Sequence, residues 1–341
     1  MAVIARSWER ALVELGFSVT TVAGAGRARH IIPALSWPAP EPMPSRIDTV
    51  AALGAALADV DLVIVENLCS LPLSPHASEV VSEVLTGRPA VLHHHDLAWQ
   101  RPRLAHLTGM PPDNPAWRHV TVNELSRSQL GERGIEAQTI ANSFDVDESP
   151  GEREPTRAML GIGPDERVVL HPVRAIERKG IPDALRLAEA LGATYWLTGP
   201  AEEGYGPTLA ALLGSARCRV LHTPAPTGMA DAYAASDLVA FPSTWEGFGN
   251  PLIEAAIHRR PLAVNLYPVA ADIADLGFRW FTVGDADGIA RFLDLGDRSA
   301  SATTFHDHNA ALARSHFSHD RLRRELGELL STMGFTGMTH T

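Results

Sequence analysis

The sequence predicts an α/β protein built from two Rossmann-like domains, and two observations support this prediction. Short β-rich runs alternate with longer amphipathic stretches, which is typical of parallel sheets with helical crossovers. The alternation stops at a polar segment that contains proline and glycine, residues 149–155, and then begins again. We therefore expect two units joined by a hinge that face each other across a cleft at the carboxyl ends of their strands.

The first half of the chain supplies the first domain, which we predict to span residues 1–148. Residues 1–15 have helical character and are followed by Gly16, so we expect this domain to lack the strand that normally opens such a fold. The alternative is that residues 1–5 form a short first strand. Strands are predicted at residues 18–23, 62–65, 90–94, 119–122 and 138–140, with helices such as 48–58 and 74–85 between them.

The second domain is predicted to span residues 149–318. Its strands are expected at residues 168–171, 194–198, 219–222, 238–241, 262–264 and 280–283, and its helices include 182–191, 208–213, 229–235 and 251–258. Residues 320–330 predict a terminal helix. We expect this helix and its tail, residues 319–341, to pack back toward the first domain.

Composition and charge narrow the classes of function. The formal net charge of −11 argues against broad nucleic-acid binding, which needs a basic surface. No run of 18 apolar residues predicts a transmembrane helix, and the N-terminus lacks a secretory pattern. Cys69 and Cys218 lie far apart and suggest no disulfide framework. These features favour a cytoplasmic protein, and they leave its oligomeric state open.

The most informative segment is residues 241–256, Phe-Pro-Ser-Thr-Trp-Glu-Gly-Phe-Gly-Asn-Pro-Leu-Ile-Glu-Ala-Ala. A buried strand runs into a loop with two glycines and then into a helix, for which Asn250 is the expected N-cap. Backbone N–H groups of residues 247–250 are then expected to point at an anion. Glu246 and Glu254 can accept hydrogen bonds from sugar and ribose hydroxyls. The structural alternative is that Glu254 complements the helix dipole and the glycines form a tight turn.

The order of strand, Pro-Ser, paired glutamates and helix resembles the E-x7-E signature of the retaining glycosyltransferases of family 4, which have the GT-B fold. Other similarities to that family follow in the expected order along the chain. They are a His95-Asp96 pair, an Asn142-Ser143-Phe144-Asp145 turn, an R-x4-K element from Arg174 to Lys179, and a strand-to-glycine turn over residues 196–200. The Gly-rich loop that most members place near the N-terminus is not found, and residues 258–268 also depart from the family pattern.

The resemblance implies roles for individual residues. Arg174 and Lys179 would bind the donor diphosphate and stabilise its charge as it leaves, for which a planar guanidinium and a mobile ammonium are well suited. Their structural alternative is two solvated surface cations. Glu254 would hold the ribose. The implied donor-binding set is Arg174, Lys179, Glu246, Gly247, Phe248, Gly249, Asn250 and Glu254, and the implied catalytic set is Arg174, Lys179, Glu246 and His95.

The activity implied is the transfer of a hexose, with retention, from a UDP- or GDP-linked donor to a hydroxyl of a sugar, glycan or small-molecule acceptor. The resemblance also implies that no metal or other cofactor takes part. Two alternatives remain open at the level of sequence. One is a glycoside phosphorylase of the same architecture, and the other is a non-catalytic nucleotide-sugar or glycan-binding protein, if the N-terminal Gly-rich loop is truly absent.

A run of histidines before Asp96 raises the question of a metal. On a strand, His93 and His95 share one face and His94 points to the other. Zinc usually needs three or four converging ligands, and the sequence shows no second cluster, so no metal site is predicted. His93 and His94 are interpreted as packing or surface residues, and His95 as a residue that contacts the sugar or the acceptor.

Two further acidic patterns have plainer interpretations. Glu66 and Asn67 follow a predicted strand, so they either contact acceptor hydroxyls or cap the strand end. Asp145 and Asp147 mimic a metal-binding Asp-x-Asp motif, but they lie at the predicted hinge. We therefore assign them to the turn that begins at Asn142.

Overall fold

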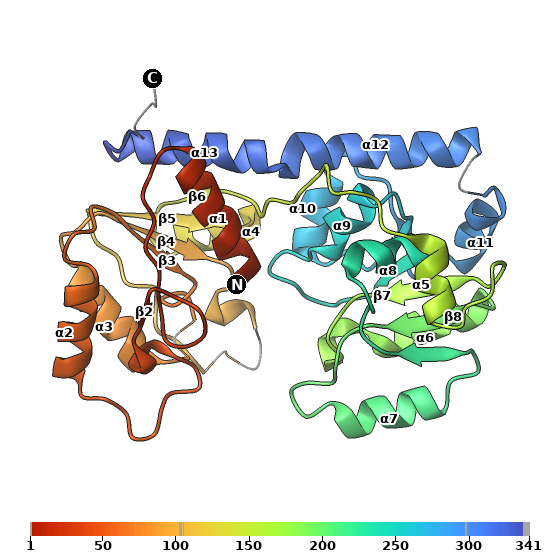
Figure 1. Cartoon of the computed structure of the whole chain (residues 1–341), viewed down its shortest axis with the longest axis horizontal. Helices are drawn as coiled ribbons and strands as arrows, with labels where there is room; N and C mark the ends of the chain where they lie inside the picture. Colours follow the sequence, from red (N-terminus) through yellow and green to blue (C-terminus); the bar gives the residue numbers. More distant parts are fainter. Residues whose placement is uncertain (1, 72, 102–103, 105, 297–298, 337–341) are drawn as a thin grey trace. The chain divides into compact units, whose positions relative to one another are not determined.

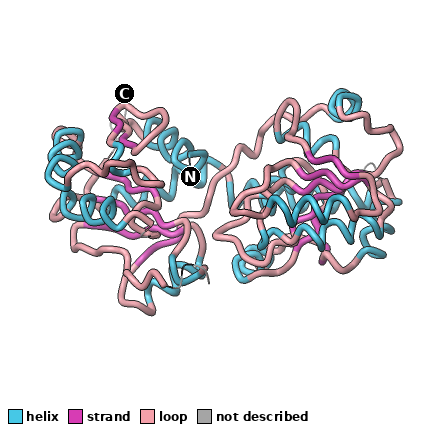
Figure 2. The backbone as a smooth tube through the Cα atoms, turned by 90° about the horizontal axis from the view of Figure 1, so that it is seen from below, coloured by secondary structure: helices cyan, strands magenta, loops and turns pink. Residues whose placement is uncertain are grey.

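The computed structural model describes residues 2–71, 73–101, 104, 106–296 and 299–336. The chain divides into two compact units (Figure 1). Unit 1 comprises Met1–Ser143 and His319–Thr341, and unit 2 comprises Phe144–Ser318. Each unit contains a parallel sheet with helices around it (Figure 2), so the predicted α/β class is confirmed. Among the described residues no helix is both long and apolar enough to cross a membrane.

Unit 1 is built on a four-stranded parallel sheet with the strand order β3-β4-β5-β6. The strands are β3 (Val63–Glu66), β4 (Ala90–His94), β5 (Trp117–Thr121) and β6 (Ala137–Thr139). The helices are α1 (Ala2–Glu14), α2 (Arg46–Ala56), α3 (Pro75–Leu85), α4 (Glu124–Gly131) and α13 (His319–Thr332), with short 3-10 turns at Pro33–Leu35 and Ala98–Gln100.

The two faces of this sheet are covered by different helices because successive side chains of a strand point to opposite sides. On β4, Leu92 faces a core that includes Leu53 of α2 and Val80 of α3. Its neighbour Val91 faces a second core, to which Trp8 of α1 contributes together with residues of α13. Burying both faces in this way explains why the strand is apolar along most of its length.

Two predictions about the start of the chain can now be judged. The helical character expected for residues 1–15 is confirmed by α1 (Ala2–Glu14), so the alternative of a short strand at residues 1–5 is wrong. The strand predicted at residues 18–23 is reduced to β1 (Val22–Ala23), which pairs with β2 (His30–Ile31) in a separate two-stranded sheet. Helix α1 forms because Trp8, Ala11 and Leu12 recur at helical spacing and are buried together.

Unit 2 is built on a six-stranded parallel sheet with the strand order β12-β11-β10-β7-β8-β9. The strands are β7 (Val168–His171), β8 (Thr194–Leu197), β9 (Val220–His222), β10 (Leu238–Phe241), β11 (Leu262–Val264) and β12 (Phe281–Thr282). The helices are α5 (Arg153–Met159), α6 (Ile181–Ala190), α7 (Gly206–Gly214), α8 (Met229–Ala235), α9 (Pro251–Ile257), α10 (Pro268–Ala274), α11 (Ala286–Asp294) and α12 (Ala300–Phe317), with a 3-10 turn η4 (Glu177–Lys179).

The strand order of unit 2 reverses between β7 and β10. From β7 the chain builds outward through β8 and β9, and from β10 it builds in the other direction through β11 and β12. Such a reversal is a topological switch point, and ligands of open parallel sheets bind beside it at the carboxyl ends of the strands. The loops that follow β7 and β10 are therefore where a site is expected, and both carry the motifs found in the sequence.

The segment predicted as a linker, residues 149–155, is partly helical, because α5 begins at Arg153. Arg153 forms an ion pair with Asp237 at 2.5 Å, which ties the start of this helix to the body of unit 2. Pro155 lies in the first turn of α5, where a proline costs little stability because the N–H groups of that turn have no helical partner.

Asp147, which precedes this segment, forms an ion pair with Arg314 of α12 at 2.8 Å.

Candidate functional site

The loop after β7 in unit 2 brings Lys179 to the end of β10. Lys179 is the last residue of η4, and Gly180 follows it with a φ of 66°. A Cβ atom at Gly180 would lie 2.4 Å from the carbonyl oxygen of Pro242, so only glycine allows the two loops to approach this closely. The backbone N–H of Thr244 also donates to the carbonyl of Arg178, at 2.9 Å.

Glu246 lies between two cations at this switch point. Its carboxylate pairs with the ammonium of Lys179 and, at 2.6 Å, with the guanidinium of Arg178. Glu246 and Lys179 are both buried, with 7% and 8% of their surfaces exposed. Burial raises the pKa of Glu246, but the charges of Lys179 and Arg178 outweigh it, so the pKa lies below its usual value. The cluster therefore holds two cations against one carboxylate and carries a net positive charge.

Arg178 is a member of this cluster that sequence reasoning missed. It stands next to Lys179, and its guanidinium also donates to the carbonyl of Trp245 at 2.5 Å. The signal that could have found it is the Arg178-Lys179 pair, two neighbouring cations in the loop that follows β7.

Arg174 occupies a different position in the same loop. Its exposed guanidinium pairs with Glu202, on the loop after β8, at 2.5 Å. The two loops are held together because the N–H of Ala175 donates to the carbonyl of Pro200 at 2.8 Å. At Gly199 a Cβ atom would lie 2.2 Å from the carbonyl oxygen of Val173, so this glycine permits the contact.

Glu254 of α9 is held by Tyr233 of α8. The Tyr233 hydroxyl donates to a Glu254 carboxylate oxygen at 2.7 Å. Burial raises the pKa of Glu254 above its usual value, and the Tyr233 hydrogen bond opposes this rise. On its other side the Tyr233 ring stacks on His258, with 4.8 Å between ring centroids. The hydroxyl and the stacked rings fix the direction of the carboxylate.

The glycine loop before α9 is shaped by Tyr267, whose hydroxyl donates to the carbonyl of Phe248 at 3.0 Å. Gly249 has a φ of 95°, and a Cβ atom there would lie 2.1 Å from that hydroxyl. The ring of Phe248 packs against Phe317, with 5.7 Å between ring centroids. The side chain of Phe248 is therefore part of the interior of unit 2.

Asn250 occupies the N-cap position of helix α9, as predicted, but its side chain does not cap the helix. Asn250 already has helical backbone angles, φ −48° and ψ −40°, and its side chain makes no capping hydrogen bond. Pro251 does occupy the first turn, as predicted, and the N–H of Glu254 donates to the carbonyl of Asn250 at 3.0 Å. That the N–H groups of residues 247–250 face an anion stays a prediction.

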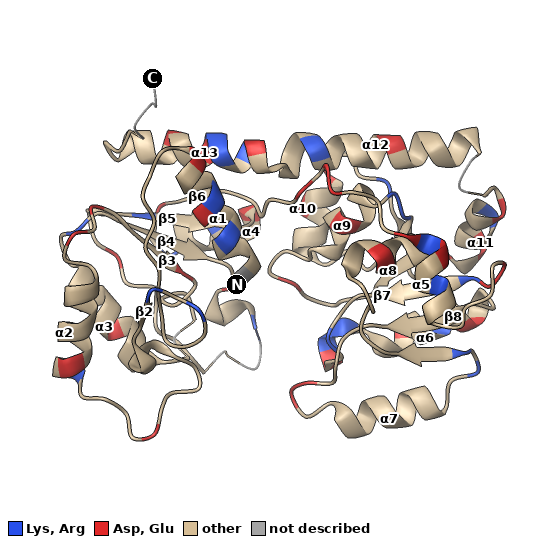
Figure 3. Ribbon diagram, in the orientation of Figure 1, with Lys and Arg blue, Asp and Glu red and all other residues tan. Residues whose placement is uncertain are grey.

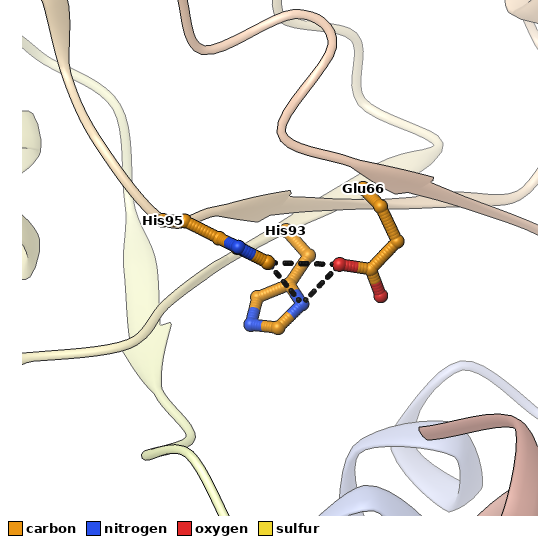
Figure 4. A group of neighbouring side chains, drawn as sticks. All are labelled: Glu66, His93 and His95. Carbon is orange, nitrogen blue, oxygen red and sulfur yellow. Dashed lines mark hydrogen bonds and ion pairs between the residues drawn. The ribbon is translucent and has the colours of Figure 1, made fainter. Parts of the chain in front are cut away.

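Unit 1 contains a second cluster, formed by Glu66, His93 and His95 (Figure 4). Glu66 ends β3 and is the register partner of His93 on β4, and His95 lies two residues further on the same face. Oε2 of Glu66 lies 3.0 Å from Nδ1 of His93 and 2.8 Å from Nε2 of His95. These two ring nitrogens are 3.3 Å apart.

Two expectations about the histidine run can now be judged. His93 and His94 are each only 1% exposed, so of the two positions expected for them packing is right and a surface position is wrong. The premise that no further ligand converges on His93 and His95 is also wrong, because Glu66 supplies one. Burial raises the pKa of Glu66, but hydrogen bonds to the two imidazoles outweigh it and lower the pKa to about 2. Burial lowers the pKa of His93, so its ring is neutral at neutral pH.

His94 points to the opposite face and joins a separate hydrogen-bonded chain. Its Nδ1 lies 2.7 Å from the hydroxyl of Ser70, and its Nε2 lies 2.8 Å from Nδ1 of His119. Nε2 of His119 in turn lies 3.1 Å from a carboxylate oxygen of Asp113. This chain gives the buried side chain of His94 hydrogen-bond partners, which buried polar groups need.

Along α13, Arg residues are interspersed with Asp and Glu (Figure 3).

Comparison with known proteins finds glycosyltransferases that are similar to this chain. No protein-family model matches the chain. It is 26% identical over 326 residues to a mannosylglucosylglycerate synthase of Thermotoga maritima, covering 79% of this chain and 76% of the relative. It is 27% identical over 278 residues to the same enzyme of Petrotoga mobilis, covering 66% and 64%. A 142-residue stretch is 37% identical to a D-inositol 3-phosphate glycosyltransferase of Rhodococcus opacus, covering 38% and 30%.

Solved structures share the architecture. A glycosyltransferase from Rickettsia africae superimposes with a TM-score of 0.71 at 15% identity, covering 95% of this chain and 94% of that one. Anabaena Alr3699/HepE, solved in complex with UDP-glucose, gives a TM-score of 0.64 at 23% identity, covering 83% and 82%. The fold is therefore that of two Rossmann-like units of the GT-B type, as the sequence predicted.

Proposed function

We propose that this chain is a retaining glycosyltransferase that moves a hexose from a UDP- or GDP-linked donor to an acceptor hydroxyl without a metal ion. The similarity to glycosyltransferases and the GT-B fold support the class of reaction. The observation that carries the proposal is the cluster at the switch point of unit 2, in which the buried Lys179 and Glu246 meet the partly exposed Arg178.

The positive cluster suits a departing nucleoside diphosphate. Lys179 and Arg178 exceed the charge of Glu246, so an entering diphosphate meets uncompensated positive charge. Because the site is buried, this attraction is weakened less by water than it would be at the surface. Arg174, on the exposed part of the same loop, adds a planar donor fork for phosphate oxygens. Under this proposal these cations do the work that a metal ion does in other transferases.

The two glutamates are proposed to hold the sugar and the ribose. Glu246 is ionised and accepts hydrogen bonds from hydroxyls of the transferred hexose, together with the backbone of residues 247–250. Glu254 accepts from ribose hydroxyls, with Tyr233 fixing its direction. In unit 1, His95 contacts the acceptor, which we propose only as a class: a sugar, a glycan or a small molecule with a free hydroxyl.

The proposed chemistry needs no protein nucleophile. The bond between the anomeric carbon and the phosphate oxygen breaks while the acceptor oxygen bonds to the same face of that carbon. The acceptor proton passes to the leaving phosphate oxygen, so charge and atoms balance. Lys179 and Arg178 stabilise the negative charge that develops on the diphosphate, which is the largest demand of such a step.

A thermal-shift screen against UDP-, GDP- and ADP-hexoses and inorganic phosphate tests the donor class. A ligand at a hundred times its Kd should stabilise the fold by about 2.7 kcal/mol, and Lys179→Gln should remove that shift. Product from the best donor should keep the donor's anomeric configuration by NMR. Stabilisation by inorganic phosphate plus a disaccharide, with none by nucleotides, would instead identify a phosphorylase. Nucleotide binding without transfer to any acceptor would leave a binding protein.

A further inference from the structure

The cluster in unit 1 brings three good metal ligands together from two neighbouring strands. Glu66 offers a carboxylate oxygen, and His93 and His95 each offer a ring nitrogen, all on one face of the sheet (Figure 4). The three atoms are separated by 2.8 Å, 3.0 Å and 3.3 Å. Among the described residues, no other group of three His, Cys, Asp or Glu side chains has ligand atoms so placed.

These separations are close to what a tetrahedral ion requires. Zinc lies about 2.0–2.1 Å from imidazole nitrogen and carboxylate oxygen, which places neighbouring ligands roughly 3.3 Å apart. The two imidazole nitrogens already have this separation. The two contacts to Glu66 are shorter by a few tenths of an ångström, the difference between an N–H···O bond and two atoms that share an ion. Small side-chain adjustments would therefore seat an ion.

The ligands are held in position before any ion arrives. The ring of Trp8 stacks on His93, with 4.1 Å between ring centroids, and restricts its orientation. The side-chain oxygen of Asn67 accepts from the backbone N–H of His95 at 2.9 Å and of Asp96 at 3.2 Å, which fixes the turn after β4. A site whose ligands are already oriented loses less entropy when it binds.

The mixture of exposed and buried ligands leaves room for an incoming group. The side chain of His93 is completely buried, that of His95 is 8% exposed, and that of Glu66 is 21% exposed. An ion would therefore be reached from the side of Glu66, the least buried of the three ligands. Three protein ligands leave one position of a tetrahedral ion open, unlike a closed structural zinc site, which has four.

We propose that Glu66, His93 and His95 form a three-ligand site for a divalent transition-metal ion of the zinc class, whose fourth ligand is water or a substrate oxygen. Two imidazole ligands favour zinc and other first-row transition metals over Mg²⁺ and Ca²⁺, which prefer a coordination shell made only of oxygen ligands. The proposal does not depend on the proposed function, because metal binding is measured without any transfer assay.

The test is zinc binding by the full chain with any affinity tag removed. After dialysis against EDTA, the protein is titrated with Zn²⁺ in competition with a chromophoric chelator. Co²⁺ loading then reports geometry, because four-coordinate Co²⁺ absorbs strongly in the visible range. We expect one ion per chain. Glu66→Gln, which keeps the size of the side chain, and His93→Gln should each weaken binding by about a hundredfold or more. His30→Ala, on β2 of the same unit and outside the cluster, should not.

Thermal melts of the metal-free variants show whether they remain folded, and the zinc-dependent rise in Tm of the unmodified chain gives a readout that needs no variant. A chain that takes up no zinc and shows no such rise would overturn the proposal, leaving a hydrogen-bonded triad only. Binding that is equally strong in Glu66→Gln and His93→Gln would overturn it as well, because the ion would then lie elsewhere.

Discussion

The two units place titratable side chains at the same kind of position, the carboxyl ends of adjacent parallel strands, but with opposite electrostatic character. In unit 2, Lys179 and Arg178 both pair with the carboxylate of Glu246, and the cluster carries a net positive charge. In unit 1, Glu66 faces His93 and His95, and burial keeps at least the His93 ring neutral. The first cluster is suited to an anion and the second to a cation or to hydroxyl groups. The same edge of a parallel sheet thus serves different ligands, depending on which side chains the strands deliver.

The strongest test of the positive cluster compares two cations of one loop. Lys179→Ala should lower kcat by about a hundredfold or more, the usual cost of losing one charge-stabilising donor, and so should Arg174→Ala. The two should differ in stability. Lys179 is buried against Glu246, so its loss should cost on the order of 3 kcal/mol, whereas loss of the exposed Arg174 should cost under about 1 kcal/mol.

Steady-state kinetics and urea unfolding of both variants provide the measurements. Near-normal kcat in both would remove the diphosphate role from this loop. If the two variants are equally stable, Arg178 alone compensates the buried charge of Glu246. Lys179→Met, which keeps the length of the side chain, would then distinguish the effect of losing the charge from the effect of losing packing.

The next test breaks the close approach that builds the positive cluster. Gly180→Ala introduces a Cβ atom 2.4 Å from the Pro242 carbonyl oxygen at a φ of 66°. We expect a loss of about 2–3 kcal/mol and weaker donor binding, since the loop carrying Lys179 must move. The matched control is Gly54→Ala in helix α2 of unit 1, where nothing lies within 4 Å, and it should stabilise by about 0.5–1 kcal/mol. A urea midpoint that decreases in Gly54→Ala as well as in Gly180→Ala would contradict this account.

A third test uses pH and His258, which stacks on Tyr233 beside Glu254. Burial and, less strongly, Arg260 lower the pKa of His258 from 6.5 to about 4. Between pH 6.5 and 4 the unfolded chain therefore binds more protons, so this contribution to stability is present above pH 6.5 and is lost as the pH falls. From pH 7.5 to 5 the free energy of unfolding should drop by about 2 kcal/mol from this residue.

His258→Phe keeps the stacked ring and removes the titration, so this part of the pH dependence should vanish. His222→Gln, at an exposed side chain, should leave it unchanged. Urea unfolding at the two pH values measures both. An unaltered slope in His258→Phe would mean that other groups cause the acid sensitivity.

The smallest expected effect is that of removing metal ions on the rate of transfer, and it concerns both clusters. Transfer should continue in EDTA, because Lys179, Arg178 and Arg174 are proposed to stabilise the diphosphate in place of an ion. Zinc at the unit 1 cluster would occupy the ring of His95, so removing it should leave the rate unchanged or raise it slightly. Activity that disappears with EDTA and returns with Mn²⁺ or Mg²⁺ would refute metal-independent transfer and would restore interest in Asp145 and Asp147.

Much of the fold could be predicted from local patterns. The strands at β7 and β10 and the helices α3 and α9 lie within a residue or so of their predicted positions, because runs of buried residues and turn residues act over a few positions only. The shortened strand at residues 22–23 was harder to predict. Its pairing is with residues 30–31 in a separate small sheet, and no local pattern specifies a partner.

The sequence by itself determined the alternation of strands and helices, the two units, and the motif that carries Glu246 and Glu254, since each depends on residues that are neighbours in the chain. Only the tertiary structure decided which side chains meet. Arg178 reaches Glu246 across 68 positions of sequence, and Glu66 reaches His93 across 27. Both contacts depend on the order and register of strands, which the packing of helices on the two faces of each sheet selects. Periodicity reports whether a residue is buried, but not which strand lies next to it.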